Sequence, residues 1–299
     1  GTLLAKELKS YTAQIRLVAR QPKQVNGDDE LFPADLLDAE QAARAVAGAD
    51  VAYLVAGLKY DGRVWERQWP AIMPNVIDAC LKHGSKLVFF DNVYLYDKAA
   101  IPHMTEQSKA NPPSRKGRVR LKVVQLLNEA MAKQGLQALI ARCADFYGPG
   151  AKNGILNMLV LDDIARGKKP KWQADAHRIH SFTYTPDAAR ATAILGNSAS
   201  AYGRAWHLPT SPERLTGRDF IELAASIKGI QVSYTILTPL LLSLAGLFNR
   251  TIKELVEMQY QNDRDYYFDS AEFCEAFGFT PTGYEAGIRD VLAYDDRLT

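Results

Sequence analysis

The feature that most constrains the fold is a regular alternation of strand patterns with helix patterns over the first half of the chain. The strand patterns are short, largely apolar runs at residues 15–20, 51–55, 86–90 and 137–141. Before the last of them, apolar side chains recur every fourth position, at Val119, Val123, Leu127 and Met131. This alternation predicts an α/β fold in which a parallel sheet carries helices on both faces.

The chain opens on a glycine that is followed by a helix pattern and then a strand pattern. Leu4 and Leu8 lie on one helix face, and the strand pattern ends at Arg20. In the dinucleotide fingerprint, the last glycine lets helix and strand pack closely, and the pyrophosphate rests on the helix N-terminus. We interpret Gly1 as that glycine, which predicts a Rossmann-type doubly wound parallel sheet. We expect another strand and at least two more glycines before it.

Length and composition predict two parts. The chain has 299 residues, of which 47% are hydrophobic, enough for one large domain and a smaller companion. Helix patterns dominate beyond Gly150, at residues 155–165, 186–195, 216–227 and 270–277. We predict a dinucleotide-binding Rossmann domain over residues 1–150, whose first strand is missing, and a mostly helical substrate domain over residues 151–299. Segments near residues 181–210 are expected to return to the Rossmann core.

The charge pattern and the apolar runs exclude two classes of partner. The formal net charge is +2, and no Lys/Arg tract alternates with aromatic residues, so no nucleic acid is expected to bind. The most apolar run, residues 237–248, is interrupted by polar residues and proline and is too short to span a bilayer, so no membrane is expected either. This run predicts a buried helix or a subunit contact, the latter in a homodimer.

The cysteines and histidines do not form a metal motif. His177 and His180 lie three residues apart, but no third ligand follows at a matching spacing, so we predict no metal. The odd set of cysteines also lacks metal-ligand spacing and is typical of a reducing compartment, which predicts a cytoplasmic protein. This set consists of Cys80, Cys143 and Cys274.

Several short motifs occur in an order that is typical of one family. They are residues 1–8, Asp35 with Leu36, Val55 with Ala56 and Gly57, Asn75, residues 142–150, and residues 180–184 with Asp187. On these motifs the chain resembles an extended, atypical short-chain dehydrogenase/reductase of the NAD-dependent epimerase/dehydratase family. The resemblance implies that a nicotinamide cofactor is contacted by Gly1, Asp35, Leu36, Val55, Ala56, Gly57 and Asn75.

The positions that carry proton chemistry in this family hold other residues here. The family uses a Ser or Thr together with a Tyr-x-x-x-Lys pair, whose Lys also holds the ribose. Asn92 stands at the Ser position, and Lys116 and Arg120 stand at the positions of the pair. Because like charges one helical turn apart disfavour each other's charged form, Lys116 could transfer a proton. Alternatively, Lys116 only binds phosphate or ribose, or faces solvent. Arg120 is expected to bind the cofactor.

Arg20 bears on the choice of cofactor. It follows the second strand of the family's fold, where an acidic residue would hold a ribose hydroxyl. A guanidinium at this position suits a 2′-phosphate, to which it can donate two hydrogen bonds. We therefore predict NADP, with NAD as the alternative; an Arg that is merely solvated at a strand end is the other interpretation.

The remaining candidates follow strand ends, where parallel sheets place their ligands. Asp91 and Asn92 are catalytic candidates together with Lys116, although an Asn side chain can only hydrogen-bond a carbonyl or hydroxyl group. Substrate contacts are expected from Tyr94, Asp145, Tyr147 and His180. The alternative for the tyrosines is packing, and for the aspartate it is capping a turn.

Two functions fit these observations. The first is an NAD(P)-binding oxidoreductase or epimerase/dehydratase-like protein that acts on a small hydroxyl or carbonyl compound, such as a sugar derivative. The alternative is a non-catalytic NADP-binding redox sensor or regulator, which the replaced Tyr-x-x-x-Lys pair favours.

Overall fold

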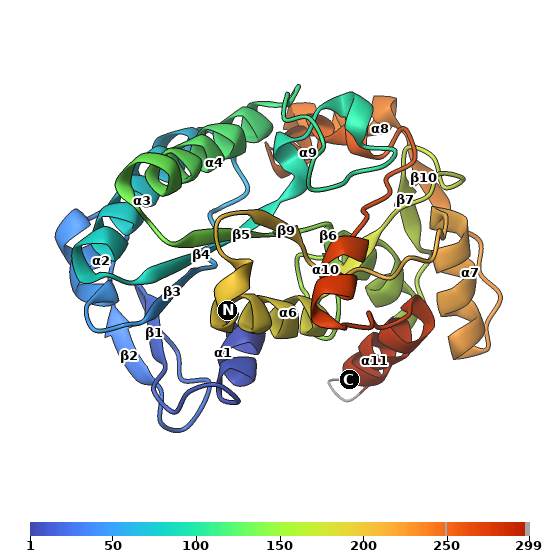
Figure 1. Ribbon diagram of the computed structural model, residues 1–299. Coiled ribbons are helices and arrows are strands. Elements are labelled where there is room, and N and C mark those ends of the chain that lie inside the picture. The colour runs from blue at the N-terminus through green and yellow to red at the C-terminus, as the bar shows by residue number, and fades with distance from the viewer. Residues whose placement is uncertain (249, 297–299) are drawn as a thin grey trace. The chain divides into compact units, whose positions relative to one another are not determined.

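The computed structural model describes residues 1–248 and 250–296, and it describes side chains for residues 1–244 and 253–294 (Figure 1). The chain forms two compact units. Unit 1 combines residues 1–94, 115–142 and 189–206, and unit 2 combines residues 95–114 and 143–188 with the chain from residue 207 on. The predicted division into a dinucleotide domain over 1–150 and a substrate domain over 151–299 stays a prediction.

Unit 1 is built on parallel strands. One sheet pairs β1 (Arg16–Ala19) in parallel with β2 (Glu30–Pro33). The second sheet has the strand order β3 (Val51–Leu54), β4 (Lys86–Asn92), β5 (Ala138–Cys143) and β9 (Ala205–His207). In this sheet β3 and β4 are parallel, and every residue of β5 is buried, as expected for strands that are covered on both faces. The predicted α/β fold with a parallel sheet is confirmed.

Helices cover both faces of the sheet in unit 1. In Figure 1, α2, α3 and α4 lie along one face, and α1 lies on the other together with the part of α6 that belongs to this unit. The bounds of these helices are Thr2–Leu8 for α1, Ala39–Val46 for α2, Gly62–His83 for α3, Arg115–Gln134 for α4 and Thr185–Asn197 for α6.

Helix α3 runs through two prolines, Pro70 and Pro74. Each proline lacks the N–H that would bond the carbonyl four residues earlier, at a cost of about 3 kcal/mol. Full burial of one large apolar side chain contributes about 1.5–3 kcal/mol, so a long buried stripe outweighs two prolines. The stripe of α3 comprises Trp65, Trp69, Met73, Val76 and Cys80, all at most 7% exposed.

Unit 2 contains short strands between helices. Sequence patterns predicted the helical run 155–165, in which the structure has a π-helical turn at Asn157–Leu161, followed by α5 (Asp162–Ala165). They missed two strand pairs, β6 (Asp145–Tyr147) with β8 (Phe182–Tyr184) and β7 (Lys171–Gln173) with β10 (Thr235–Leu237). Three-residue strands are too short to show a periodicity.

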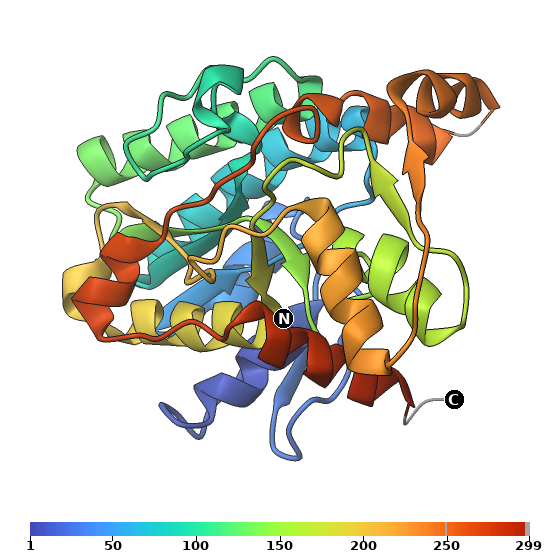
Figure 2. The same cartoon turned by 90° about the vertical axis from the view of Figure 1, so that its right-hand side faces the viewer.

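The later helices of unit 2 pack around an aromatic core. Figure 2 shows α7 (Gly217–Lys228) and α11 (Tyr284–Asp296) side by side, and α10 spans Ala271–Phe277. The Tyr284 ring meets the Phe220 ring edge-to-face at 4.8 Å between centroids, which joins the two helices. The same buried cluster holds Tyr147, Trp172 and Phe182.

The apolar run of residues 237–248 forms α8 (Pro239–Phe248), and α9 (Arg250–Val256) follows it. Leu240, Leu241 and Leu244 are 70%, 53% and 52% exposed, which does not fit a buried helix. The side chains of residues 245–248 lie outside the described residues, and the predicted subunit contact stays a prediction. Of the helices formed by the described residues, none is both long and apolar enough to cross a membrane.

Gly287 on α11 tests the packing of this core. A Cβ atom at this position would overlap the hydroxyl oxygen of Tyr147, whose fully buried ring contacts the rings of Tyr184 and Tyr284. We expect Gly287→Ala to lower the free energy of unfolding by about 1–3 kcal/mol, the range for overpacking, in urea denaturation. Gly27→Ala, where the new methyl group meets nothing within 4 Å, is the control. A loss in Gly287→Ala no larger than in this control would contradict the packing.

Candidate functional site

Two of the predicted cofactor-binding segments are joined in unit 1. The Asn75 side chain on α3 donates a hydrogen bond from Nδ2 to the Leu36 carbonyl at 2.9 Å, which fixes the loop after β2. Asp35 in this loop accepts the Leu37 N–H at 3.0 Å, and its own N–H donates to the Gln41 side chain at 3.0 Å. Asp35 and Leu36, both predicted to contact the cofactor, therefore lie in one ordered, partly exposed loop.

Asp38 and Gln41, three residues apart at the start of α2, form part of a capping box. The Asp38 side chain caps α2 by accepting the Gln41 N–H at 3.0 Å. In a full capping box the Gln41 side chain would accept the Asp38 N–H. Instead its Oε1 accepts the Asp35 N–H, and its Nε2 donates to the Asp38 carboxylate at 2.9 Å. The side chain thus supports the loop that carries Asp35 and Leu36.

The first turn of α1 and the segment after β3 lie together. A Cβ atom on Gly1 would lie 3.7 Å from the Val55 side chain. Ala56 and Gly57, which follow, are exposed, and a Cβ atom on Gly57 would meet nothing within 4 Å. Arg20 is also exposed, directly after β1. These positions offer open space and backbone groups, as a bound dinucleotide requires.

A buried ion cluster lies at the end of β4. Both carboxylate oxygens of Asp91 accept hydrogen bonds from guanidinium groups: Oδ1 from Arg120 Nε at 2.8 Å, and Oδ2 from Arg142 Nη2 at 3.1 Å. The three residues are at most 3% exposed. The guanidinium of Arg120 also lies over the rings of Trp69 and Phe89, at 4.5 and 4.7 Å from their centroids. This arrangement favours a positioning role for Asp91, and the predicted cofactor contact of Arg120 stays a prediction.

Lys116, one turn before Arg120 on α4, has a different environment. It is fully buried, and its Nζ lies over the Tyr60 ring at 4.8 Å from the centroid. The hydroxyls of Tyr60 and Tyr94 are 3.3 Å apart, and Asn92 Oδ1 accepts the Tyr94 N–H at 3.1 Å. The structure thus brings together the predicted residues Lys116, Asn92 and Tyr94. It adds Tyr60, which the sequence analysis missed although it follows the Val55–Gly57 segment by three residues.

Two predicted substrate residues are joined in unit 2. His180 Nε2 and the Asp145 Oδ2 carboxylate oxygen are 3.0 Å apart, and His180 is 3% exposed. The imidazole lies parallel to the Tyr266 ring at 4.3 Å between centroids, with 2° between the planes. The contact with Asp145 and the stacking on Tyr266 therefore fix the orientation of the His180 imidazole ring.

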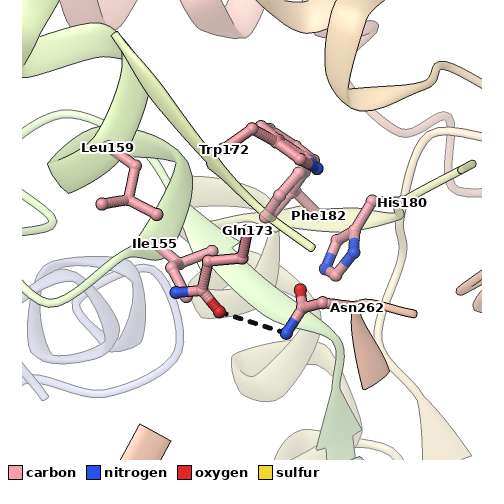
Figure 3. A pocket seen from close by; sticks show the side chains of 7 residues that line it. All are labelled: Ile155, Leu159, Trp172, Gln173, His180, Phe182 and Asn262. Atoms are coloured by element: carbon pink, nitrogen blue, oxygen red, sulfur yellow. Dashed lines mark hydrogen bonds between the residues drawn. The ribbon is translucent and has the colours of Figure 1, made fainter. Parts of the chain in front are cut away.

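His180 also borders a small hollow in unit 2 (Figure 3). Aliphatic and aromatic side chains line most of it, with polar groups from Gln173 and Asn262, whose amides are joined by a 3.3 Å hydrogen bond. Apolar walls with a few fixed polar groups are the usual composition of a ligand site. The lining residues are Ile155, Leu159, Trp172, Gln173, His180, Phe182 and Asn262.

Tyr147 lies in the core of unit 2. It is fully buried, and its hydroxyl makes no hydrogen bond with any described residue. Burial raises its pKa well above 10, because the phenolate would lose its hydration. Its predicted substrate contact stays a prediction, which the complete burial does not favour. Among the described residues, no group of three His, Cys, Asp or Glu side chains could hold a metal ion.

Comparisons with known proteins agree with these features. The model of the NAD dependent epimerase/dehydratase family matches residues 1–206. A UDP-N-acetyl-alpha-D-glucosaminuronate decarboxylase of Bacillus cytotoxicus is 24% identical over 212 residues, which are 64% of this chain and 66% of that enzyme.

Solved structures with the same fold include those of sugar-nucleotide epimerases. The UDP-glucose 4-epimerase of Thermotoga maritima, solved with UDP-glucose, has a TM-score of 0.81 at 16% identity, over 100% of this chain and 96% of that chain. The UDP-glucuronic acid 4-epimerase of Bacillus cereus, solved with NAD, has a TM-score of 0.76 at 15% identity, over 100% and 95%. At this level of identity the likeness establishes the fold, in agreement with the prediction.

The Asp91 cluster yields a stability prediction. Asp91→Asn removes the negative charge between two buried guanidinium groups, and breaking a buried pair on one side typically costs about 3–5 kcal/mol. We expect a loss of this order in the free energy of unfolding, measured by urea denaturation. Asp28→Asn is the control, because its ion pair with Lys9 is exposed and should matter far less. Equal losses in the two variants would contradict a structural role for Asp91.

Proposed function

Because the chain belongs to the NAD dependent epimerase/dehydratase family, we propose that it binds a nicotinamide dinucleotide and acts on a hydroxyl or carbonyl group of a sugar derivative. One observation carries this proposal: the family match over residues 1–206 includes every residue predicted to contact the cofactor. The contact between Asn75 and the Leu36 carbonyl supports it, since it orders the loop that would face the adenine.

The residues of unit 1 fit the proposed cofactor. Asp35 and Leu36 would hold the adenine end, Gly1 the pyrophosphate, and Val55 to Gly57 would lie under the dinucleotide. When bound, the cofactor would supply a nicotinamide ring that accepts and returns a hydride. Lys116 would then assist the proton transfer at the reacting group, and Asn92 would hydrogen-bond its oxygen atom.

A sugar nucleotide is the substrate class we propose. The similar decarboxylase and both epimerases are named for UDP-sugars. Asp145 could accept a hydrogen bond from a sugar hydroxyl, and His180 beside it could donate or accept one. The amides of Gln173 and Asn262 add further donors and acceptors at the same hollow.

We propose NADP as the preferred cofactor, although the B. cereus epimerase was solved with NAD. The support is Arg20, an exposed guanidinium directly after β1, where a 2′-phosphate would accept two hydrogen bonds. We also propose a cytoplasmic location, from the cysteine pattern, and a homodimer in which the exposed leucines of α8 form the contact.

A cofactor sensor without catalysis is the second candidate. The observation that favours it is the environment of Arg120, which stands at the position of the ribose-binding Lys but directs its guanidinium to Asp91. A chain that had lost its catalytic pair could still bind the dinucleotide and report its redox state to a partner. Measured turnover of a substrate distinguishes the enzyme from the sensor, because only the enzyme would convert one.

The first test concerns the cofactor. We expect the protein to bind NADPH more tightly than NADH in calorimetry, and Arg20→Ala to remove roughly 1–3 kcal/mol of this preference, the scale of a charge-assisted hydrogen bond. Arg44→Ala, an exposed arginine on α2, should leave the ratio of affinities unchanged. Equal affinities for the two cofactors in the unmodified protein would refute the role of Arg20.

The second test concerns catalysis. The protein should convert at least one member of a panel of UDP-glucose, UDP-glucuronic acid and UDP-N-acetylglucosamine in the presence of NAD(P), as measured by product analysis. Lys116→Met should lower this turnover by about 10²–10⁴-fold, the usual contribution of acid–base catalysis that Lys116 would assist, with little change in cofactor affinity. Lys122→Met, at an exposed position of the same helix, is the matched control. Cofactor binding without any turnover would favour the sensor.

A further inference from the structure

Two tyrosines follow neighbouring strands of the parallel sheet in unit 1. Strands β3 and β4 are paired in parallel, with Leu54 opposite Phe89. Tyr60 lies in the segment after β3, and Tyr94 lies two residues after β4. Side chains that follow the carboxyl ends of adjacent parallel strands gather where such sheets bind ligands. Both tyrosines are half-buried, so a ligand can still reach them.

Trp65 holds the two phenol rings. Its ring stacks on Tyr94 with 20° between the planes and meets Tyr60 edge-on at 84°, each at 6.1 Å between centroids. Trp65 is itself 7% exposed, and its Nε1 donates to the Lys59 carbonyl at 3.1 Å. The separation of 3.3 Å between the two hydroxyls therefore belongs to a fixed arrangement, in which one hydroxyl can donate to the other.

Lys116 adds a positive charge to the pair. Its Nζ lies over the Tyr60 ring at 4.8 Å from the centroid, and the residue has no exposed surface. A nearby cation favours the ionised form of a phenol, all the more where water is scarce. Arg120 does not compete for this role, since its guanidinium binds the Asp91 carboxylate.

We propose that the Tyr60–Tyr94 hydroxyl pair, with Lys116 as its electrostatic partner, transfers the proton of the reaction, in place of a Tyr-x-x-x-Lys pair. This inference rests on the proposed function. The O–H bond of the substrate breaks while a new O–H bond forms on the ionised hydroxyl of the pair. The proton can then pass across the contact between the two hydroxyls, and the reverse step returns it to the product oxygen. The positive charge of Lys116, over the Tyr60 ring, stabilises the ionised phenol.

The first measurement is turnover in Tyr60→Phe, Tyr94→Phe and the double variant, with the UDP-sugar panel and NAD(P). These changes remove only hydroxyl oxygens and leave the rings on Trp65. We expect kcat to fall by about 10²-fold or more in the double variant, with unchanged cofactor affinity and a loss of the acidic limb of the pH profile, because the ionised hydroxyl that accepts the proton is removed. Tyr11→Phe, an exposed tyrosine, is the control and should keep full turnover.

A second measurement needs no turnover. Tyrosinate absorbance is followed against pH in the protein and in Lys116→Met. Loss of the positive charge in Lys116→Met should raise the pH at which one tyrosine ionises. The same substitution, made in the Tyr60→Phe/Tyr94→Phe background, should leave the tyrosine ionisation steps unchanged.

The outcomes separate this inference from the proposed function. Turnover that survives in the double variant overturns the proton-transfer role while the proposed function stands. If Lys116→Met still shifts a tyrosine ionisation after both the Tyr60 and Tyr94 hydroxyls have been removed, Lys116 is not coupled to this pair. This conclusion holds whether or not the protein turns over a sugar nucleotide. If the unmodified protein converts none of the substrates, the proposed function itself is wrong. The tyrosinate absorbance measurement alone then tests the coupling between Lys116 and the tyrosine pair.

Discussion

The buried carboxylate of Asp91 is the interaction on which unit 1 depends. Two guanidinium groups share it, and burial of such charges is favourable only when hydrogen bonds replace the lost water. Arg120 and Arg142 provide these bonds from α4 and β5, while Asp91 stands near the end of β4. Because Arg120 also lies over the rings of Trp69 and Phe89, a single cluster joins α3, β4, α4 and β5. Asn92, the last residue of β4, and Tyr94, two residues beyond it, are thereby fixed in place.

The same cluster explains why two cations one helical turn apart have different surroundings. Arg120 turns its guanidinium to Asp91 and so contributes to the interior of the unit. Lys116, four residues earlier, places its Nζ over the Tyr60 ring. An Arg suits the first position, since its planar fork can serve a carboxylate and lie between aromatic rings at once, whereas a Lys is a compact point charge. Two cations one turn apart on α4 therefore act in different places, Arg120 in the buried ion cluster and Lys116 beside a phenol.

The sequence predicted most of unit 1 and the family, because alternating patterns and short motifs are local signals. Local signals also mark the cap at Asp38 and the end of α3 at Gly84, which has a left-handed backbone. The path of α3 through Pro70 and Pro74 has no such signal, since the buried stripe that outweighs the two prolines is a property of the packed unit. Likewise, the contact of Asn75 with Leu36 spans 39 residues, and no local pattern specifies it.

The tyrosines show most clearly what only packing could decide. Tyr147 lies in a motif that predicts a substrate contact, yet it is buried in unit 2, as is Tyr266 beside His180. Burial raises the pKa of both phenols, because the ionised form would lose its hydration, so they stay protonated and are poor proton acceptors. Tyr60 carries no motif, but it is half-buried, lies 3.3 Å from a second hydroxyl and has a cation over its ring. A phenol that is to exchange a proton needs both access and a charge that stabilises its ionised form, and of these tyrosines Tyr60 meets both requirements, with the Tyr94 hydroxyl beside it.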